Sequence, residues 1–330
     1  MPAPHPAPHT AAPPASDGHA GDGPERGGRW VLDCRGRALD VRPGRGVVMG
    51  VLNVTPDSFS DGGRYGSVAA AVDRAGQMAE EGARIVDVGG ESTRPGAEPV
   101  TADEELARVV PVVEAVVRAL PDLLVSVDTT KGPVARAALA AGAHVVNDVS
   151  GLRDGAATAE AAAAAGAPLV VMHALAATGG AAAPDAYDDV VADVAASLGR
   201  SAARAEAAGV RDVVVDPGFG FGKSVADNLR LVAGVDRLVA GGRPVLVGVS
   251  RKSTVGAVLG RGGRPAPVGG RLYGSLGLAA LAVARGAAIV RAHDVRATAE
   301  ALRAVTAALD AAAGDGLAGG ARSGGAGGGR

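Results

Sequence analysis

Cysteine, aromatic side chains and long apolar runs are all scarce in this chain of 330 residues. Cys34 is the only cysteine, so no internal disulfide can form, and we interpret it as a buried or idle thiol of a reducing compartment. No stretch of about 18 strongly apolar residues occurs, and the amino terminus lacks the basic start and apolar segment of a secretion signal. These absences predict a cytoplasmic protein with no membrane partner.

Charge of one sign is also lacking. The net charge is −2 and the sequence pI is about 6.3, so the chain has no broad basic surface for nucleic acid. Aromatic residues make up only 2% of the chain, so the core must be built from Val, Leu, Ile and Ala. We therefore expect no nucleic-acid partner, and any anionic ligand must be bound by a few local Arg and Lys side chains.

The two ends of the chain differ in composition from its middle. Residues 1–29 are rich in Pro, Ala and Gly, residues 314–330 are mostly Gly and Ala, and neither end shows apolar periodicity. Both ends are predicted to be disordered. The prediction is therefore one domain over residues 30–313, a length typical of a single large barrel.

Eight short apolar runs alternate with eight Ala-rich segments of helical periodicity, and each run ends in a polar or charged residue. The runs are 47–53, 84–87, 123–128, 144–148, 168–173, 213–216, 244–250 and 287–293. The helical segments are 67–81, 103–119, 133–141, 155–165, 187–208, 225–240, 272–285 and 295–312. Strands with polar groups at one end predict a TIM (β/α)8 barrel, with a doubly wound open sheet as the alternative.

Helix start and stop signals agree with this alternation. Ser67 is a candidate cap for the first helix, and Thr101 with Glu104 forms a capping-box pattern before the second. Glycines stand where four helices should end: Gly82, Gly142, Gly166 and Gly209.

Polar residues at the ends of the third, fourth and sixth runs are Asp128, Asn147 with Asp148, and Asp216. A carboxylate in the mouth of a barrel is poorly hydrated unless N–H donors pair with it. A pterin ring presents two parallel donors that one carboxylate accepts side by side. The alternative for a single Asp is a helix cap, but the convergence of several favours a site for a donor-rich ring.

Loops after the runs carry further candidate groups. The segments 53–63 and 89–96 are long polar connections that we interpret as mobile lids, with ordinary turns as the alternative. The segment 216–223 holds two of the three phenylalanines, which would either contact a planar ring or pack beneath the loop. The segments 250–253 and 291–294 place cations at the last two runs, where barrels often bind phosphate, although solvated surface charge is the alternative for any one of them.

Seven strings in order along the chain resemble the dihydropteroate synthase family over about residues 47–300. They are N-V-T-P-D-S-F-S-D-G-G from Asn53, G-G-E-S-T-R-P-G from Gly89, S-V-D-T from Ser126, N-D-V from Asn147, D-P-G-F-G-F-G-K from Asp216, S-R-K-S from Ser250 and R-x-H-D from Arg291. The resemblance implies a folate-pathway transferase that joins p-aminobenzoate to 6-hydroxymethyl-7,8-dihydropterin diphosphate and releases diphosphate. It also implies a homodimer.

The resemblance assigns roles to individual residues. Four would hold the pterin: Asp128, Asn147, Asp216 and Lys252. The diphosphate and Mg²⁺ would be held by Asn53, Arg291 and His293, and Asn53 would be the metal ligand. Substrate contacts around the p-aminobenzoate pocket would come from Thr93, Arg94, Pro95, Phe221 and Ser253, and the first closing loop would use Thr55, Asp57 and Phe59. The catalytic set would be Asp57, Arg94, Lys252 and Arg291.

One segment departs from the family pattern. After the fifth run the family continues Met-His with a Gly-x-Pro loop, whereas here Met172-His173 is followed by an Ala/Gly-rich stretch over 174–186. We assign no binding role to that stretch, and we interpret His173 as a capping or packing residue.

Two other functions compete with the synthase. A methyltetrahydrofolate-dependent methyltransferase would share the fold and the acidic pterin pocket, but it would need neither Arg291 and His293 nor the two lid strings. A non-catalytic pterin-binding paralogue would keep the ring site without the reaction.

Overall fold

Eight parallel strands form a closed barrel, as the alternation of apolar runs predicts. The computed structural model describes residues 28–54, 63–92, 98–153, 155–174 and 187–313, and of residues 63–67 only the backbone. Neighbouring strands around the ring are β8-β7-β6-β5-β4-β3-β10-β9. The ring closes between β8 and β9, where the Val215 N–H donates to the Pro244 carbonyl at 3.0 Å and Val215 bridges to Val245. The fold is therefore a TIM barrel and not an open sheet.

The barrel strands lie close to the predicted runs. Their bounds are β3 Val47–Asn53, β4 Ile85–Gly89, β5 Leu124–Asp128, β6 Val145–Asp148, β7 Leu169–Met172, β8 Val213–Asp216, β9 Leu246–Val247 and β10 Ile289–Ala292. Strand β9 is much shorter than the run 244–250, β4 continues two residues past Asp87, and β10 begins two residues after the start of the run 287–293.

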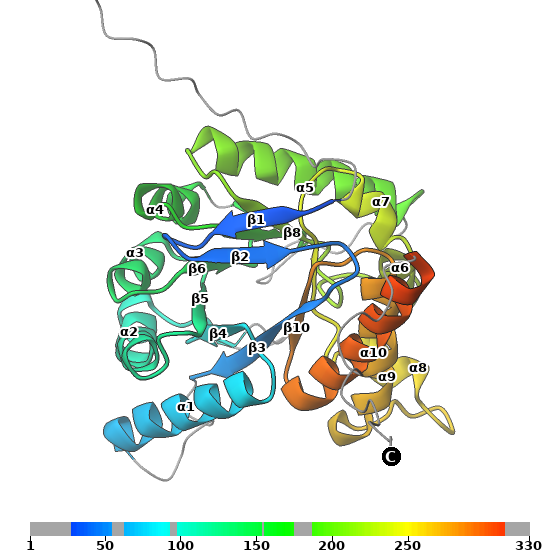
Figure 1. The fold of residues 1–330 in the computed structure, drawn as a ribbon, viewed down its shortest axis with the longest axis horizontal. Coiled ribbons are helices and arrows are strands. Elements are labelled where there is room, and N and C mark those ends of the chain that lie inside the picture. Colours follow the sequence, from blue (N-terminus) through cyan, green and yellow to red (C-terminus); the bar gives the residue numbers. More distant parts are fainter. Residues whose placement is uncertain (1–27, 55–62, 93–97, 154, 175–186, 314–330) are drawn as a thin grey trace, which may run out of the picture.

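Helices surround the barrel (Figure 1). Their bounds are α1 Gly63–Glu80, α2 Ala102–Ala119, α3 Gly132–Ala140, α4 Ala157–Ala165, α5 Val190–Ala207, α6 Val225–Ala233, α7 Val235–Val239, α8 Ser253–Val258, α9 Leu272–Ala284 and α10 Val295–Ala313, with a 3-10 turn at Val268–Gly270. The Thr101 capping box is present, with the side chains of Thr101 and Glu104 each accepting from the other's backbone N–H. The Ser67 cap is wrong, because α1 already begins at Gly63.

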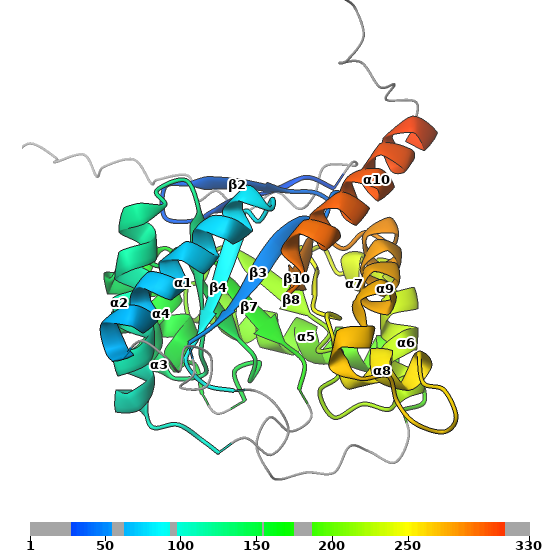
Figure 2. The same ribbon diagram turned by 90° about the horizontal axis from the view of Figure 1, so that it is seen from below.

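A hairpin of two antiparallel strands, β1 Trp30–Asp33 and β2 Ala38–Val41, lies across one end of the barrel (Figure 2). Buried Leu32 and Leu39 pack against side chains from the first residues of the barrel strands, so this is the amino-terminal end. Cys34 is buried in the same cluster, and burial raises its pKa to about 12, as expected for an idle thiol.

The side chains inside the barrel change from apolar to polar along the strands. The lower layer comes from the first residues of the strands and is apolar: Met49, Ile85, Leu124, Val145, Val170, Val214, Leu246 and Ile289. Because side chains alternate along a strand, the residues two positions further on point into the same interior. Those residues include Asp87, Ser126, Asn147, Asp216 and Arg291. The apolar layer and the hairpin therefore close one end, and the polar layer opens at the other.

None of the described helices is long and apolar enough to cross a membrane. The domain bounds at residues 30 and 313, and the cytoplasmic location, stay predictions.

Candidate active site

Arg291 is the centre of the polar layer. Its Nε donates to Asp87 Oδ2 at 2.6 Å, and its Nη2 donates to Asp128 Oδ2 at 2.7 Å. The Asn147 side-chain amide donates to the same Asp87 oxygen at 2.9 Å. Four strands, β10, β4, β5 and β6, thus contribute to one network whose acids and amide are buried. The structure brings together three predicted site residues, Asp128, Asn147 and Arg291.

Burial shifts the ionisation of this cluster. It raises the pKa of Asp128 to about 7, although the nearby Arg291 guanidinium acts in the opposite direction. Burial also opposes the charge on Arg291, but Asp87 and Asp128 outweigh this effect and raise its pKa further. Arg291 is therefore a permanent cation beside a carboxylate that can exist in either form near neutral pH.

Asp216 and Lys252 form the second part of the site. Asp216 is buried and accepts from the Gly218 N–H at 2.7 Å, while the Lys252 Nζ donates to the Phe219 carbonyl at 2.5 Å. Burial raises the pKa of Asp216 and lowers that of Lys252 to about 8. Within the described part of the chain, Asp216 Oδ2 accepts no hydrogen bond. This oxygen and the partly desolvated Lys252 ammonium suit a ring that carries both donors and acceptors.

The two phenylalanines of this loop have different roles. Phe219 is fully buried in the main core, whereas half-buried Phe221 lies under Lys252, whose Nζ is 4.5 Å from the ring centroid. The packing alternative is thus correct for Phe219, and Phe221 remains the candidate for contact with a planar ring.

Lys223 holds the same loop in shape. Its Nζ donates to the carbonyls of His173, Gly218 and Phe221 at 3.1, 2.8 and 3.2 Å. Gly218 has φ +67°, and a Cβ there would lie 1.8 Å from the His173 oxygen. Only glycine therefore permits this close approach of the loop to the end of β7.

His293, Asn53 and Ser253 lie at neighbouring positions of the rim. The His293 N–H donates to Ser250 Oγ at 3.1 Å, and its Nδ1 is 3.1 Å from the same oxygen. Asn53, at the end of β3, and Ser253, the first residue of α8, are exposed. These three predicted residues thus lie near the carboxyl ends of β3, β9 and β10, where Asn53 and Ser253 are exposed.

Asp148 and His173 are not part of the polar layer. The Asp148 carboxylate accepts from the Ser150 N–H and hydroxyl at 2.7 and 2.6 Å and from the Thr158 hydroxyl at 2.5 Å. The pairing of Asn147 with Asp148 in a ligand site is therefore wrong, because Asp148 fixes the loop that leads to α4. His173 is buried, and burial lowers its pKa to about 4, as expected for a packing residue.

Six predicted residues lie outside the described part of the chain: Thr55, Asp57, Phe59, Thr93, Arg94 and Pro95. The residues that flank 93–97 are well fixed. Glu91 accepts from the Val100 N–H at 3.1 Å and from Lys131 Nζ at 2.5 Å, and the same ammonium donates to buried Glu105 at 2.6 Å. The two sides of the second loop are thus tied together at its base.

Asp87 is the site residue that sequence reasoning missed. It appeared only as the end of a predicted strand, whereas it lies inside β4 and is fully buried. A charged residue within the apolar run Ile85–Val88 demands a buried partner, and Arg291 in the last run was the available cation. An acidic residue inside an apolar strand was therefore the feature of the sequence that could have identified Asp87 as a site residue.

The described residues contain no cluster of three His, Cys, Asp or Glu side chains that could hold a metal. Mg²⁺ prefers oxygen ligands and usually keeps waters and substrate phosphates in its shell. The exposed Asn53 carboxamide has no hydrogen-bond partner among the described residues, and it fits such a site as a single protein ligand.

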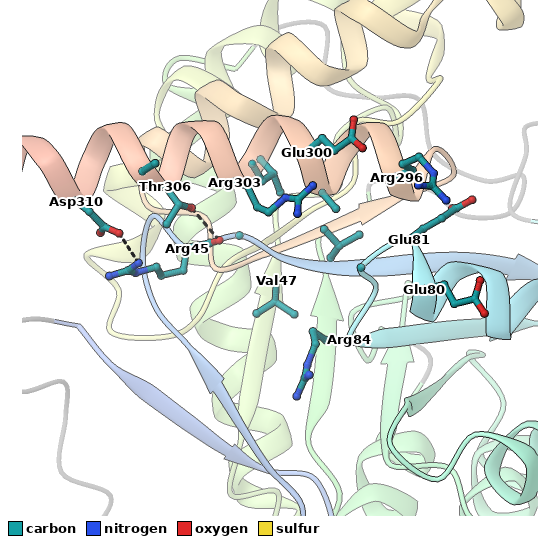
Figure 3. A pocket seen from close by; sticks show the side chains of 16 residues that line it. Arg45, Val47, Glu80, Glu81, Arg84, Arg296, Glu300, Arg303, Thr306 and Asp310 are labelled. Atoms are coloured by element: carbon teal, nitrogen blue, oxygen red, sulfur yellow. Dashed lines mark hydrogen bonds and ion pairs between the residues drawn. The ribbon is translucent and has the colours of Figure 1, made fainter. Parts of the chain in front are cut away.

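A cavity of about 610 Å³ lies elsewhere, over β3 between α1 and α10 at the amino-terminal side of the barrel (Figure 3). Arg45 and Asp310 form a salt bridge at the edge of the cavity, which is also lined by Arg84, Arg303 and Glu300. It contains no residue of the polar layer, so it is not the candidate active site.

Comparisons with known proteins agree with this geometry. The family model described as pterin binding enzyme matches residues 49–293. A dihydropteroate synthase of Escherichia coli K12 is 45% identical over 282 residues, which cover 85% of this chain and 97% of that protein.

Two solved structures are similarly close. The dihydropteroate synthase of Xanthomonas albilineans with 4-aminobenzoic acid has a TM-score of 0.76 and 48% identity, covering 84% of this chain and 98% of that one. The Yersinia pestis enzyme in a sulfonamide drug complex has a TM-score of 0.77 and 43% identity, covering 85% and 100%. The chain belongs to the pterin-binding enzyme family and, within it, to the dihydropteroate synthases.

Proposed function

We propose that the polar layer and the rim above it carry out the dihydropteroate synthase reaction in a defined arrangement. The enzyme joins p-aminobenzoate to 6-hydroxymethyl-7,8-dihydropterin diphosphate, giving 7,8-dihydropteroate and diphosphate. The observation that carries the arrangement is that buried acids and partly buried cations meet at one end of the barrel, with Arg291 between Asp87 and Asp128.

The pterin ring would lie against Asp128, Asn147, Asp216 and Lys252. A carboxylate can accept two parallel N–H donors, as it does from an arginine side chain. Buried Asp216 accepts one hydrogen bond from the described residues, the Gly218 N–H on Oδ1, and so retains capacity for donors of the ring. Phe221 beside Lys252 would border the p-aminobenzoate pocket together with Ser253. Desolvated groups that already face the ligand give strong, oriented binding.

The diphosphate would lie toward Asn53, Arg291 and His293. Cleavage of the methylene–oxygen bond places growing negative charge on the diphosphate, and cations held ready at that position stabilise it. Bound Mg²⁺, with Asn53 as a protein ligand, would supply further charge neutralisation for the leaving group. The electron-rich dihydropterin bears the positive charge left on its methylene.

The aniline nitrogen of p-aminobenzoate then attacks the methylene carbon, and the proton that this nitrogen must lose passes to solvent or to the released diphosphate. This amine is neutral near pH 7 and needs no strong base, so positioning and charge stabilisation should dominate catalysis. From the resemblance we assign Asp57 and Arg94 to the two loops that close over the reacting groups, with Thr55, Phe59, Thr93 and Pro95 as their substrate contacts. Water exclusion by those loops would protect the cationic methylene.

A direct assay tests the proposal. Purified protein with Mg²⁺ and the two substrates should form 7,8-dihydropteroate and diphosphate in equal amounts, and a sulfonamide should compete with p-aminobenzoate. Pterin binding without product would favour the non-catalytic paralogue. Methyl transfer from methyltetrahydrofolate without dihydropteroate formation would favour the methyltransferase.

The chain also presents an apolar surface suited to a second copy of itself. On α9, Tyr273 and Leu281 are 83% and 39% exposed, and Gly277 lies between them on the same helix face. Val258 and Val268 on the neighbouring segments are each more than half exposed. Large exposed apolar side chains gathered on neighbouring segments are typical of a protein interface, and we propose a homodimer through the α9 face.

The oligomeric state checks this part of the proposal. Sedimentation velocity should give a dimer for the unaltered chain and a monomer for the variant Tyr273→Glu with Leu281→Glu. Val31→Glu, at an exposed apolar residue of the hairpin, is the matched control and should stay dimeric. A monomer at all concentrations of the unaltered chain would exclude the α9 dimer.

A further inference from the structure

Arg251 has a backbone conformation that non-glycine residues rarely adopt. Its φ is +60°, in the left-handed region, where the Cβ atom crowds the following carbonyl. It stands in the connection from β9 to α8, between Ser250 and Lys252. Strained backbone at a functional site persists only where surrounding contacts hold it.

Those contacts come from two other segments of the chain. The Arg251 Nε donates to Asp294 Oδ2 at 2.9 Å, and its Nη2 donates to the other oxygen of the same carboxylate. The Arg251 N–H donates to Ser275 Oγ at 2.9 Å, and its carbonyl accepts from Arg271 Nη1 at 2.9 Å. The side chain and both backbone polar groups of Arg251 are thus engaged at once.

The turn connects the two halves of the proposed site. On one side of Arg251, Ser250 accepts from the His293 N–H at 3.1 Å. On the other side, the Lys252 Nζ reaches the Phe219 carbonyl. A change in φ at Arg251 would rotate Lys252 relative to Ser250, and so would move the pterin-side ammonium relative to the diphosphate-side histidine.

We propose that Arg251 and Asp294 form a positioning clamp, which holds the left-handed turn and thereby fixes Lys252 in register with His293. The inference rests on the proposed function, because it assumes that the pterin and the diphosphate lie at these two groups. Neither clamp residue needs to touch the substrate. The bond that breaks joins the two parts of the substrate, so the clamp would set the geometry of that bond.

The electrostatic setting of Asp294 is consistent with this role. The hydrogen bond from Arg251 lowers the pKa of Asp294, and His293 and Arg74 lower it further. The side chains of the pair are 42% and 21% exposed, and exposed pairs add little to the stability of a fold. We therefore expect the clamp to affect catalysis more than folding.

A glycine variant at position 251 distinguishes the role of the left-handed turn from the role of the Arg251–Asp294 pair. Asp294→Asn keeps a residue able to cap α10 but removes the charged acceptor for Arg251, so the strained turn is released. Arg251→Gly also removes the clamp, but glycine adopts φ +60° without strain and so retains the turn. The double variant Arg251→Gly with Asp294→Asn then tests whether Asp294 acts only through Arg251.

The measurements are kcat, KM and, by calorimetry, the Kd for 6-hydroxymethylpterin with and without its diphosphate. Asp294→Asn should lower kcat about tenfold or more, while the Kd for the pterin lacking diphosphate stays within about threefold. Arg251→Gly should lose less, and the double variant should match Arg251→Gly. Glu206→Gln, in the Glu206–Arg243 pair at the opposite end of the barrel, is the control and should behave like the unaltered protein.

Three results would overturn the clamp. Unchanged kcat and Kd in Asp294→Asn would remove its function. A double variant as impaired as Asp294→Asn would show that Asp294 acts independently of Arg251, and an equal loss of affinity for both pterins would indicate general disruption. If the unaltered protein makes no dihydropteroate, the proposed function fails, but the Kd for the pterin diphosphate still reports whether glycine rescues Asp294→Asn.

Discussion

A single buried carboxylate, Asp87, organises the polar layer of this barrel. It pairs with Arg291 and accepts from Asn147, so two predicted ligand residues take their positions from one that was not predicted. Sequence strings identify Asn147 and Arg291 because both belong to short polar strings that the family shares. They do not reveal a residue that acts through its neighbours, since its role depends on which strands lie opposite one another in the ring.

Replacing Asp87 tests this dependence. In Asp87→Asn, Arg291 loses one of its two charged acceptors, and a hydrogen bond to a charged group contributes about 1.5–3 kcal/mol. We expect kcat/KM for the pterin diphosphate to fall between about tenfold and a hundredfold. Steady-state kinetics measure this, and Asp103→Asn, at an exposed acid of α2, should leave the value unchanged. An unaffected kcat/KM in Asp87→Asn would mean that Arg291 needs no such support.

The ionisation of Asp128 predicts a pH dependence of pterin binding. Burial raises its pKa to about 7, so the carboxylate is protonated below that pH and ionised above it. Only the ionised form accepts two N–H donors, so the affinity for 6-hydroxymethylpterin should rise with pH through 7 and level off above it. Burial raises the pKa of Asp216 as well, which acts in the same direction.

Titration calorimetry between pH 5.5 and 8.5, a range spanning about 1.5 units on either side of that pKa, checks the dependence. Asp128→Asn should bind more weakly and should lose most of the rise near pH 7. If the pH profile of this variant retains the same rise, another group controls binding.

At the scale of the elements, the strand and helix pattern was predictable because each barrel unit repeats the same apolar periodicity. The hairpin β1–β2 was not predicted, since its strands are only four residues long and each buries a single face. The segment 225–240 was predicted as one helix, but Gly234 interrupts it and separates α6 from α7. Helix α8 is six residues long, too short for helical periodicity to appear.

The hairpin should stabilise the barrel without taking part in binding. Leu39 is buried against the apolar layer, and truncating a buried Leu to Ala costs about 2–5 kcal/mol. Leu39→Ala should therefore lower the free energy of unfolding by this amount in urea titrations while both KM values stay unchanged. Val31→Ala, half exposed on the same hairpin, should change stability by less than about 0.5 kcal/mol. A change in KM for Leu39→Ala would show that the two ends of the barrel are coupled.

For the whole molecule, closing the sheet into a ring brings together groups that are far apart in the sequence. Arg291 and Asp87 are 204 residues apart along the chain, yet their side chains meet at 2.6 Å. The barrel and the end at which its polar residues gather could be predicted, because polar residues end the apolar runs at one edge. The side-chain pairs inside the ring could not be predicted, because they depend on the stagger of the strands. The apolar face of α9 could not be predicted either, because no recognisable sequence motif marks it.

The most direct test of this account is a crystal structure of the protein with 6-hydroxymethylpterin and diphosphate. We predict that the ring contacts Asp128, Asn147 and Asp216 and that the diphosphate lies beside Arg291 and His293. A ring bound in the cavity between α1 and α10, or with its donors directed away from these three residues, would contradict it.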